Sequence, residues 1–204
     1  MRTWFWLVLM AVLLNACTGI STKSNEPANP EAFKERAQRL AAHARWSLDG
    51  RVSLDDGDDG GSGKLKWVVD SGFSQLDFFA ALGRGAWHLE ISEGLATLKD
   101  ADGEHSAPDV QSLLQTRLGW PVPVEALQFW ARGLYAPGQV QTSQIDSQGL
   151  LTQLRQFGWT IDFDRYEIVG DEQLPKRLEA KHGDYRVKMV VSKWQFGDAA
   201  VAGN

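Results

Sequence analysis

Polar and apolar residues alternate along much of this chain, and that alternation predicts β-strands with one buried face. The clearest case runs from Trp46 to Leu54, where every second residue is apolar or Gly and polar residues stand between them. Strand signals recur after it, and we predict about ten or eleven strands in all. Asp102-Gly103, between two such segments, is a strong hairpin signal. The further segments are 65–69, 73–79, 87–91, 96–99, 104–107, 140–145, 150–156, 159–166, 177–182 and 185–194.

The stretch from Asp55 to Gly63 interrupts the first two strands. Its sequence, DDGDDGGSG, predicts a flexible connection of a hairpin. The acidic residues do not fit a calcium-binding EF-hand loop, which needs Glu at its twelfth position. That position, counted from Asp55 or Asp56, is Lys66 or Trp67.

Three segments have the 3.6-residue period of helices. The first starts at 29–31 (Asn-Pro-Glu), with Asn as N-cap and Pro in the first turn, and extends to about His43. Asp109 begins a second helix that Gly119 closes, and 124–132 forms a third. Strands with a few inserted helices indicate an α+β fold built on one large antiparallel sheet. A sheet of this length usually curls on itself or is covered.

The N-terminus does not follow these patterns. Arg2 precedes an unbroken apolar run from Trp4 to Leu14, which is too short to span a bilayer and has the length of a signal-peptide core. The run leads into Leu-Asn-Ala-Cys, which resembles a bacterial lipoprotein signal, in which the Cys is lipidated and becomes the new N-terminus. We therefore expect residues 1–16 to be a signal peptide, and Cys17 to carry N-acyl and S-diacylglycerol chains such as palmitate.

The residues after Cys17 predict how the rest of the chain is organised. Residues 17–29 are polar and predict a lipidated tether. In lipoproteins of this type an Asp after the lipidated Cys commonly signals inner-membrane retention, and Thr18 stands there, which favours the outer membrane. The remaining length suits one domain, residues 30–196, followed by a small, polar and flexible tail at 197–204.

Charge and residue types argue against several functions. The net charge is −5, and no cluster of Lys and Arg indicates nucleic-acid binding. The four His lie on different predicted elements without the spacing of metal ligands, and no Ser or Cys nucleophile motif occurs. Asp162 and Asp164 share one face of a predicted strand, but the solvated face of that strand is the simpler interpretation than an acid–base pair. We therefore expect no enzyme activity, no metal and no cofactor.

Short motifs through the mature chain follow the order and spacing of a known family. In sequence order they are Trp46–Val52, Leu65–Trp67, Ala80–Gly83, Leu118–Val124, Phe129–Leu134, Gln156–Trp159, Leu174–Pro175 and Lys193–Trp194. Together with the lipoprotein-type signal, they resemble the LolB family of outer-membrane lipoprotein receptors. The resemblance implies an open, unclosed antiparallel β-barrel of about 10–11 strands, with short helices covering or filling an apolar cavity.

The resemblance also implies a function. Members of this family accept lipoproteins from the periplasmic carrier LolA, bind their acyl chains, and release them into the inner leaflet of the outer membrane. We expect this chain to do so as a monomer that faces the periplasm. A Leu in a Pro-Leu-Gly loop is needed for insertion in the family; Leu82 and Gly83 match it, and Ala81 replaces the Pro. The expected cavity-lining residues are Trp67, Phe78, Leu89, Leu114, Leu127 and Trp130.

Two other functions stay open from the sequence. The chain could be a lipid-anchored envelope scaffold, whose apolar residues merely fill a core and whose surface binds other proteins. A fluorescent fatty-acid probe separates this function from lipid transfer, because a filled core does not take up the probe. An enzyme is the third alternative, and an activity lost on removal of a single His, Ser or Asp would indicate it.

Overall fold

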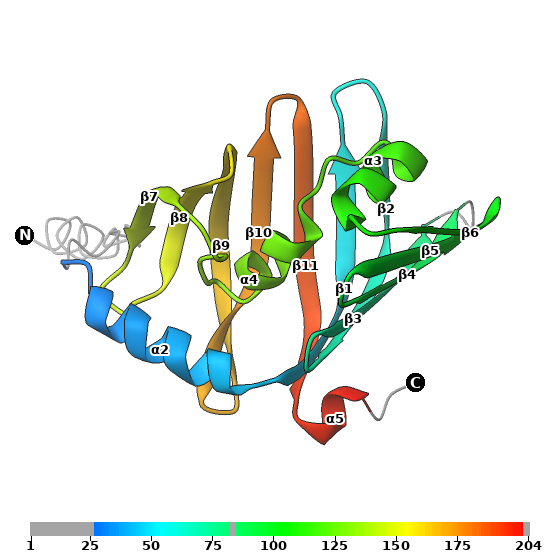
Figure 1. Cartoon of the computed structure of the whole chain (residues 1–204). Helices are drawn as coiled ribbons and strands as arrows, with labels where there is room; N and C mark the ends of the chain where they lie inside the picture. Colours follow the sequence, from blue (N-terminus) through cyan, green and yellow to red (C-terminus); the bar gives the residue numbers. More distant parts are fainter. Residues whose placement is uncertain (1–26, 82–84, 202–204) are drawn as a thin grey trace, which may run out of the picture.

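The computed structural model describes residues 27–81 and 85–201 of the 204-residue chain, and Figure 1 shows how their strands and helices are arranged. The helices are α2 (Pro30–Ala42), α3 (Val110–Leu118), α4 (Val124–Ala131) and α5 (Asp198–Val201). The strands are β1 (Arg45–Asp55), β2 (Gly60–Asp70), β3 (Phe73–Ala80), β4 (Ala86–Ser92), β5 (Leu95–Asp100), β6 (Gly103–Ala107), β7 (Val140–Ile145), β8 (Leu151–Gln156), β9 (Trp159–Val169), β10 (Glu172–His182) and β11 (Tyr185–Phe196).

The strands form a single antiparallel sheet in the order β6-β5-β4-β3-β2-β1-β11-β10-β9-β8-β7. The first strand, β1, pairs with β2 on one side and with the last strand, β11, on the other. The two halves of the chain therefore meet in the middle of the sheet. Strands β6 and β7 lie at opposite edges, and in the described part of the chain they do not pair with each other. The predicted α+β class with an open antiparallel sheet is confirmed.

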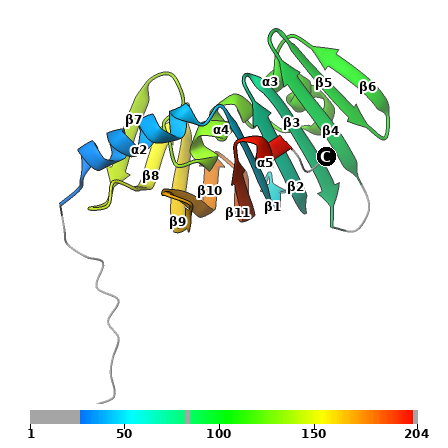
Figure 2. The same cartoon turned by 90° about the horizontal axis from the view of Figure 1, so that it is seen from below.

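The sheet is curved, and α3 and α4 lie on its concave face (Figures 1 and 2). Helix α3 contacts β5 and β6. Helix α2 runs across the ends of strands in the other half of the sheet (Figure 2). None of the described helices is both long and apolar enough to cross a membrane.

The helix ends follow the signals in the sequence. The Asn29 side chain accepts a hydrogen bond from the Ala32 amide at 3.0 Å, and the Asp109 side chain accepts one from the Ser112 amide at 2.8 Å. Gly119 ends α3 in the left-handed conformation with φ of 72°, where a side chain would be strained.

Two predictions about chain ends and connections are wrong. Residues Gly60 to Gly63 belong to β2, so that the connection predicted from Asp55 to Gly63 is shorter than expected. A Cβ atom at Gly63 would lie 2.6 Å from the Phe78 ring, so glycine lets that ring lie over the neighbouring strand. The tail predicted from Gly197 to Asn204 begins with α5, whose Asp198 forms an ion pair with Arg45 at 2.8 Å.

The hydrophobic core lies between the concave face of the sheet and the helices. The alternating side chains of β1, β2 and β11 point into it, and so do the apolar sides of α2, α3 and α4. Trp46, Trp67 and Trp130 are at most 1% exposed, although they come from two different strands and a helix. Burying side chains of this size supplies much of the stability of a fold that has no disulfides.

Candidate functional site

Helix α4 lies at the centre of the concave face, and a buried glutamine helps to fix its position. The Gln156 side chain, which is fully buried at the end of β8, accepts hydrogen bonds from the Trp130 indole and from the Ala136 amide, both at 3.0 Å. Its amide nitrogen donates to the Ala136 carbonyl at 2.7 Å. Gln156 therefore ties the helix, and the segment that follows it, to the sheet.

Two buried arginines hold the C-terminal end of α4. Arg36 of α2 donates to the carbonyl oxygens of Arg132, Gly133 and Gln173 at 2.6, 2.9 and 2.8 Å. The Arg132 guanidinium lies 5.2 Å from the ring centre of Trp46. Burial, together with the nearby charge of Arg36, lowers the pKa of Arg132 to about 10. Arg132 is therefore cationic at neutral pH, and Arg36 donates to carbonyl groups at the negative end of the helix dipole.

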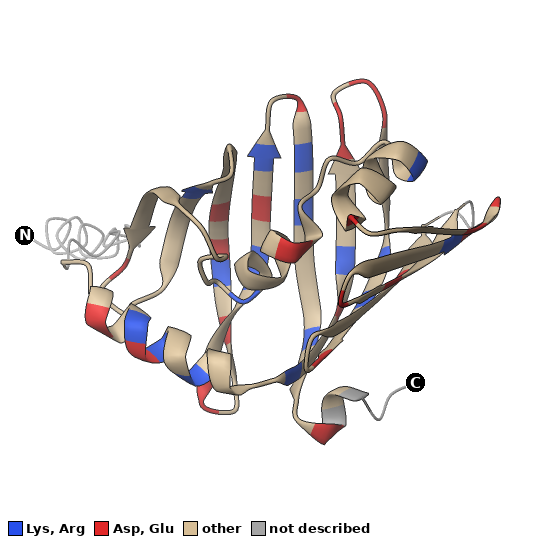
Figure 3. Ribbon diagram, in the orientation of Figure 1, with Lys and Arg blue, Asp and Glu red and all other residues tan. Residues whose placement is uncertain are grey.

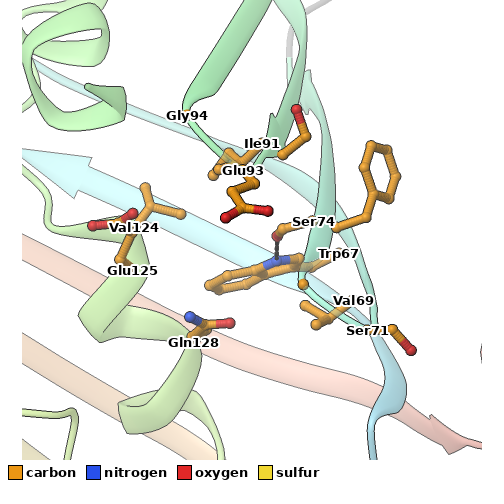
Figure 4. A pocket seen from close by; sticks show the side chains of 13 residues that line it. Trp67, Val69, Ser71, Ser74, Ile91, Glu93, Gly94, Val124, Glu125 and Gln128 are labelled. Atoms are coloured by element: carbon orange, nitrogen blue, oxygen red, sulfur yellow. Dashed lines mark hydrogen bonds between the residues drawn. The ribbon is translucent and has the colours of Figure 1, made fainter. Parts of the chain in front are cut away.

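A pocket of about 640 Å³ lies between α4 and the strands β2 to β4; we call it the first pocket (Figure 4). The apolar part of its wall is formed by Trp67, Val69, Phe73, Ile91 and Val124. The Trp67 indole nitrogen donates to the Ser74 hydroxyl at 2.7 Å, so its polar edge is already satisfied. Trp67 is fully buried and backs this wall, and the apolar surface next to the open space comes from the more exposed side chains of Phe73 and Ile91.

A second pocket, of about 550 Å³, lies on the other side of α4. Its wall includes Phe129 of the helix, with Phe157 and Trp159 from the turn between β8 and β9 and the start of β9. Val124, Glu125 and Gln128 line both pockets. Both volumes fall in the range of small-molecule binding pockets, about 300–1,000 Å³. The concave face can therefore accommodate apolar ligands on both sides of α4.

The charged side chains among the described residues that line these pockets are acidic. Figure 3 shows that Lys and Arg positions alternate with acidic ones along the central strands and α2, and that several turns carry acidic residues. The acidic lining residues are Glu93, in the turn between β4 and β5, and Glu125 at the start of α4. Neither carboxylate forms an ion pair within the described part of the chain. No Lys or Arg occurs among the described residues that line the two pockets.

The structure brings the six expected cavity-lining residues together. All are at most 5% exposed and belong to one apolar cluster on the concave face. Trp67 also lines the first pocket, whereas the other five pack against neighbouring side chains. Their contact with a lipid stays a prediction. The six are Trp67, Phe78, Leu89, Leu114, Leu127 and Trp130.

Other residues that line the pockets were missed by the sequence analysis. Val124, at the start of α4, and Ile91, on β4, were recognised only as members of a helix and a strand. Trp159 belongs to one of the family motifs but was not assigned to the cavity. Glu93 and Gln128 carry no sequence signal, because isolated polar residues in a turn or a helix are common on protein surfaces.

Three predicted functional residues lie outside the described residues: Cys17, Leu82 and Gly83. Within the described part of the chain, no group of three or more His, Cys, Asp or Glu side chains could hold a metal ion. Asp162 and Asp164, which the sequence places on one face of a strand, lie 3.5 Å from Lys181 and 3.3 Å from Arg177 respectively. These are ordinary ion pairs of a solvated strand face.

Comparison with known proteins gives consistent matches over most of the chain. A family model described as "Outer membrane lipoprotein LolB" matches residues 44–194. The outer-membrane lipoprotein LolB of Pseudomonas aeruginosa PAO1 is 33% identical over 199 residues, which cover 96% of this chain and 97% of the relative. The protein of the same name from Alkalilimnicola ehrlichii is 34% identical over 190 residues, covering 92% and 94%.

One solved structure shares the fold at low sequence identity. A putative outer membrane lipoprotein-sorting protein domain from Vibrio parahaemolyticus has a TM-score of 0.52 and 11% identity, and the match covers 83% of this chain and 94% of that chain. At this level of identity the likeness concerns the fold alone.

Proposed function

Because the chain belongs to the LolB family of outer membrane lipoproteins, we propose that it accepts lipoproteins from the periplasmic carrier LolA and inserts them into the outer membrane. In this proposal the acyl chains of the cargo occupy the concave face of the sheet. The observation that carries it is the pair of pockets on either side of α4, which leave room next to an apolar surface. A scaffold protein would need no such space.

The transfer needs no energy source if each step is downhill. Acyl chains pass from the carrier to this protein when its pockets bind them more tightly, and a tenfold gain in affinity needs only about 1.4 kcal/mol. Release into the membrane then follows because a bilayer solvates several acyl chains at once. The apolar walls around Trp67 and Trp159 supply binding that depends on buried area and not on one chemical group.

The remaining parts of the proposal rest on the sequence. Cys17 carries the lipid that anchors the protein in the outer membrane, facing the periplasm, and residues 18–29 form the tether. Multiple acyl chains on one Cys give stable anchoring, since each buried CH₂ contributes about 0.8 kcal/mol. Leu82 and Gly83 form the part that enters the membrane when cargo is released.

The proposal is tested by lipoprotein transfer in solution. A version lacking residues 1–17 is mixed with LolA that carries a radiolabelled lipoprotein, and the two proteins are separated by affinity chromatography. We expect the label to move to this protein without any nucleotide. If the label stays on the carrier while this protein remains folded by circular dichroism, the receptor function is wrong. A fluorescent fatty-acid probe that is also excluded would then favour the scaffold alternative.

A further inference from the structure

We propose that Glu93 and Glu125 make the first pocket selective against lipids with an anionic headgroup, so that it takes acyl chains on an uncharged end and excludes phospholipids of net negative charge. The inference rests on the proposed function for its ligand class, acyl chains. It adds a selection between two lipids that share those chains. A lipoprotein's lipidated Cys carries ester- and amide-linked chains without phosphate, whereas the phospholipids around it each carry a phosphate.

The charges of the pocket carry this inference. Glu93 and Glu125 lie on opposite walls, one in the β4–β5 turn and the other on α4, and the space between them is backed by Trp67 (Figure 4). Neither carboxylate has a cationic partner among the described residues, so neither charge is neutralised locally. A phosphate held at this opening would meet two negative charges and, in the described lining, no positive one.

The uncharged polar groups of the lining suit an ester or an amide. The lining contributes the amide of Gln128, which lies beside the opening in Figure 4, and two hydroxyl groups that already have partners in the protein. The Ser92 hydroxyl donates to the Leu95 carbonyl at 3.4 Å, and Ser71 is hydrogen-bonded to the Asp70 carboxylate. Among the described residues, the Gln128 side chain has no hydrogen-bond partner. Such neutral donors and acceptors can pair with the carbonyl groups of an acylated Cys without paying the cost of desolvating a charge.

The second pocket has the same character. Glu125 is the charged residue of its described lining, and the polar side chains there are those of Gln111 and Gln128. An anionic headgroup would therefore meet no cationic side chain of the described lining in the second pocket either. Sites that do bind phosphate supply Arg, Lys or several free backbone amides. The N-terminal end of α4 does present backbone amides to both pockets, but Glu125 in its first turn places a full negative charge there, so that a phosphate meets that carboxylate first.

The experiment compares two lipids that differ only at the headgroup. Dioleoylglycerol and dioleoylphosphatidylglycerol, each with the same fluorescent acyl label, are titrated into the mature lipidated chain in a non-ionic detergent. We expect the wild type to prefer the uncharged lipid. In the variant Glu93→Gln/Glu125→Gln, binding of the anionic lipid should improve by about threefold to tenfold, as for two exposed charge contacts, with the uncharged lipid unaffected.

A matched control variant changes the net charge of the protein by the same amount, but at a distance from the two pockets. The variant Glu31→Gln/Glu35→Gln removes two carboxylates from α2 that are not among the lining residues of the first or the second pocket, and it should keep the wild-type preference. Raising the salt concentration should narrow the preference of the wild type, because exposed charges are screened over about 8 Å at physiological ionic strength. It should have little effect on the pocket variant.

The outcomes separate this inference from the proposed function. If the wild type binds both lipids equally, or if the pocket variant and the α2 control behave alike, the charge selection is wrong while the acyl-binding function stands. If the uncharged lipid does not bind at all, the acyl pocket itself is wrong, and this inference is overturned with it.

Discussion

At the scale of single residues, the position of α4 depends on polar groups that have exchanged water for partners within the protein. Gln156 is the clearest case, because it satisfies three buried groups with one side chain. A neutral hydrogen bond stabilises a protein only modestly, but a buried donor or acceptor without a partner costs about 1–3 kcal/mol. Loss of this side chain therefore has a larger effect than any one of its bonds.

We predict that Gln156→Leu lowers the free energy of unfolding by about 3 kcal/mol, since the Trp130 indole and both backbone groups of Ala136 lose their partner. Urea denaturation followed by tryptophan fluorescence measures this change. Gln144→Leu, on the exposed side of β7, is the control and should stay within about 0.5 kcal/mol of the wild type. Equal effects of the two substitutions would contradict the role given to Gln156.

A second residue-scale prediction concerns Leu82. The substitution Leu82→Glu should leave folding and uptake of cargo near normal and block insertion of the cargo into liposomes, because a carboxylate cannot enter the apolar part of a bilayer at low cost. Burial of one Leu contributes only about 1.5–3 kcal/mol, which is enough to direct release but not to anchor the protein. Insertion at the wild-type rate in this variant would remove Leu82 from the mechanism.

At the scale of elements, α2 is fixed at one end by the turn between β7 and β8. The Asn29 amide donates to the Asp146 carbonyl at 3.0 Å, and Gly149 of the same turn lies against the first turn of the helix. A Cβ atom on Gly149 would be 2.5 Å from the Phe33 backbone nitrogen. The glycine is therefore required by its φ of 79° and also by the close approach of another element.

Gly149 and Gly119 form a matched pair for testing this contact, because both have positive φ but only Gly149 has atoms within 4 Å of the added Cβ. We predict that Gly119→Ala costs about 1–2 kcal/mol from backbone strain alone. Gly149→Ala should cost at least about 3 kcal/mol, because α2 must also move. Urea denaturation of the two variants measures their free energies of unfolding and so compares the two costs. Similar costs would mean that α2 is not held tightly against the turn.

The sequence was sufficient to predict the elements but not the space between them. Local signals placed the ends of helices at Asn29, Asp109 and Gly119, and alternation placed nearly every strand. Alternation also identified buried faces, so Leu89 and Leu114 were correctly expected inside. It cannot tell whether a buried side chain meets another side chain or a pocket, because that depends on how far α4 stands from the sheet.

Glycine-rich and polar stretches were interpreted less well. The run from Gly60 to Gly63 has the composition of a loop, yet its backbone pairs with Leu54 and Val52 because the register of β1 continues past the last apolar residue. The polar residues Glu93 and Gln128 were also missed, because an isolated polar residue gives no sign in the sequence that it lines a pocket. Their place in a pocket follows from tertiary packing that no short segment encodes.

At the scale of the whole molecule, an open sheet with a helix on its concave face leaves a hollow on each side of that helix, next to a packed core. Arg36 and Arg132 hold the C-terminal end of α4 against α2. The N-terminal end of the helix lacks a side-chain cap, since Pro123 occupies the N-cap position without a side-chain hydrogen bond. The pockets lie beside this less restrained end, where Val124 and Glu125 line both of them.

This arrangement makes Gln128 the position where one side chain can obstruct both pockets. The indole ring introduced by Gln128→Trp should displace about two methylene groups of a bound acyl chain. The binding free energy then falls by about 1.6 kcal/mol, and lipid uptake weakens roughly tenfold. Titration with labelled dioleoylglycerol measures uptake, and thermal unfolding verifies that the fold is kept. Gln115→Trp adds the same ring to an exposed site on α3 and should bind lipid normally. Unchanged uptake in Gln128→Trp would place the acyl chains elsewhere, because a ligand between α4 and the sheet cannot avoid this side chain.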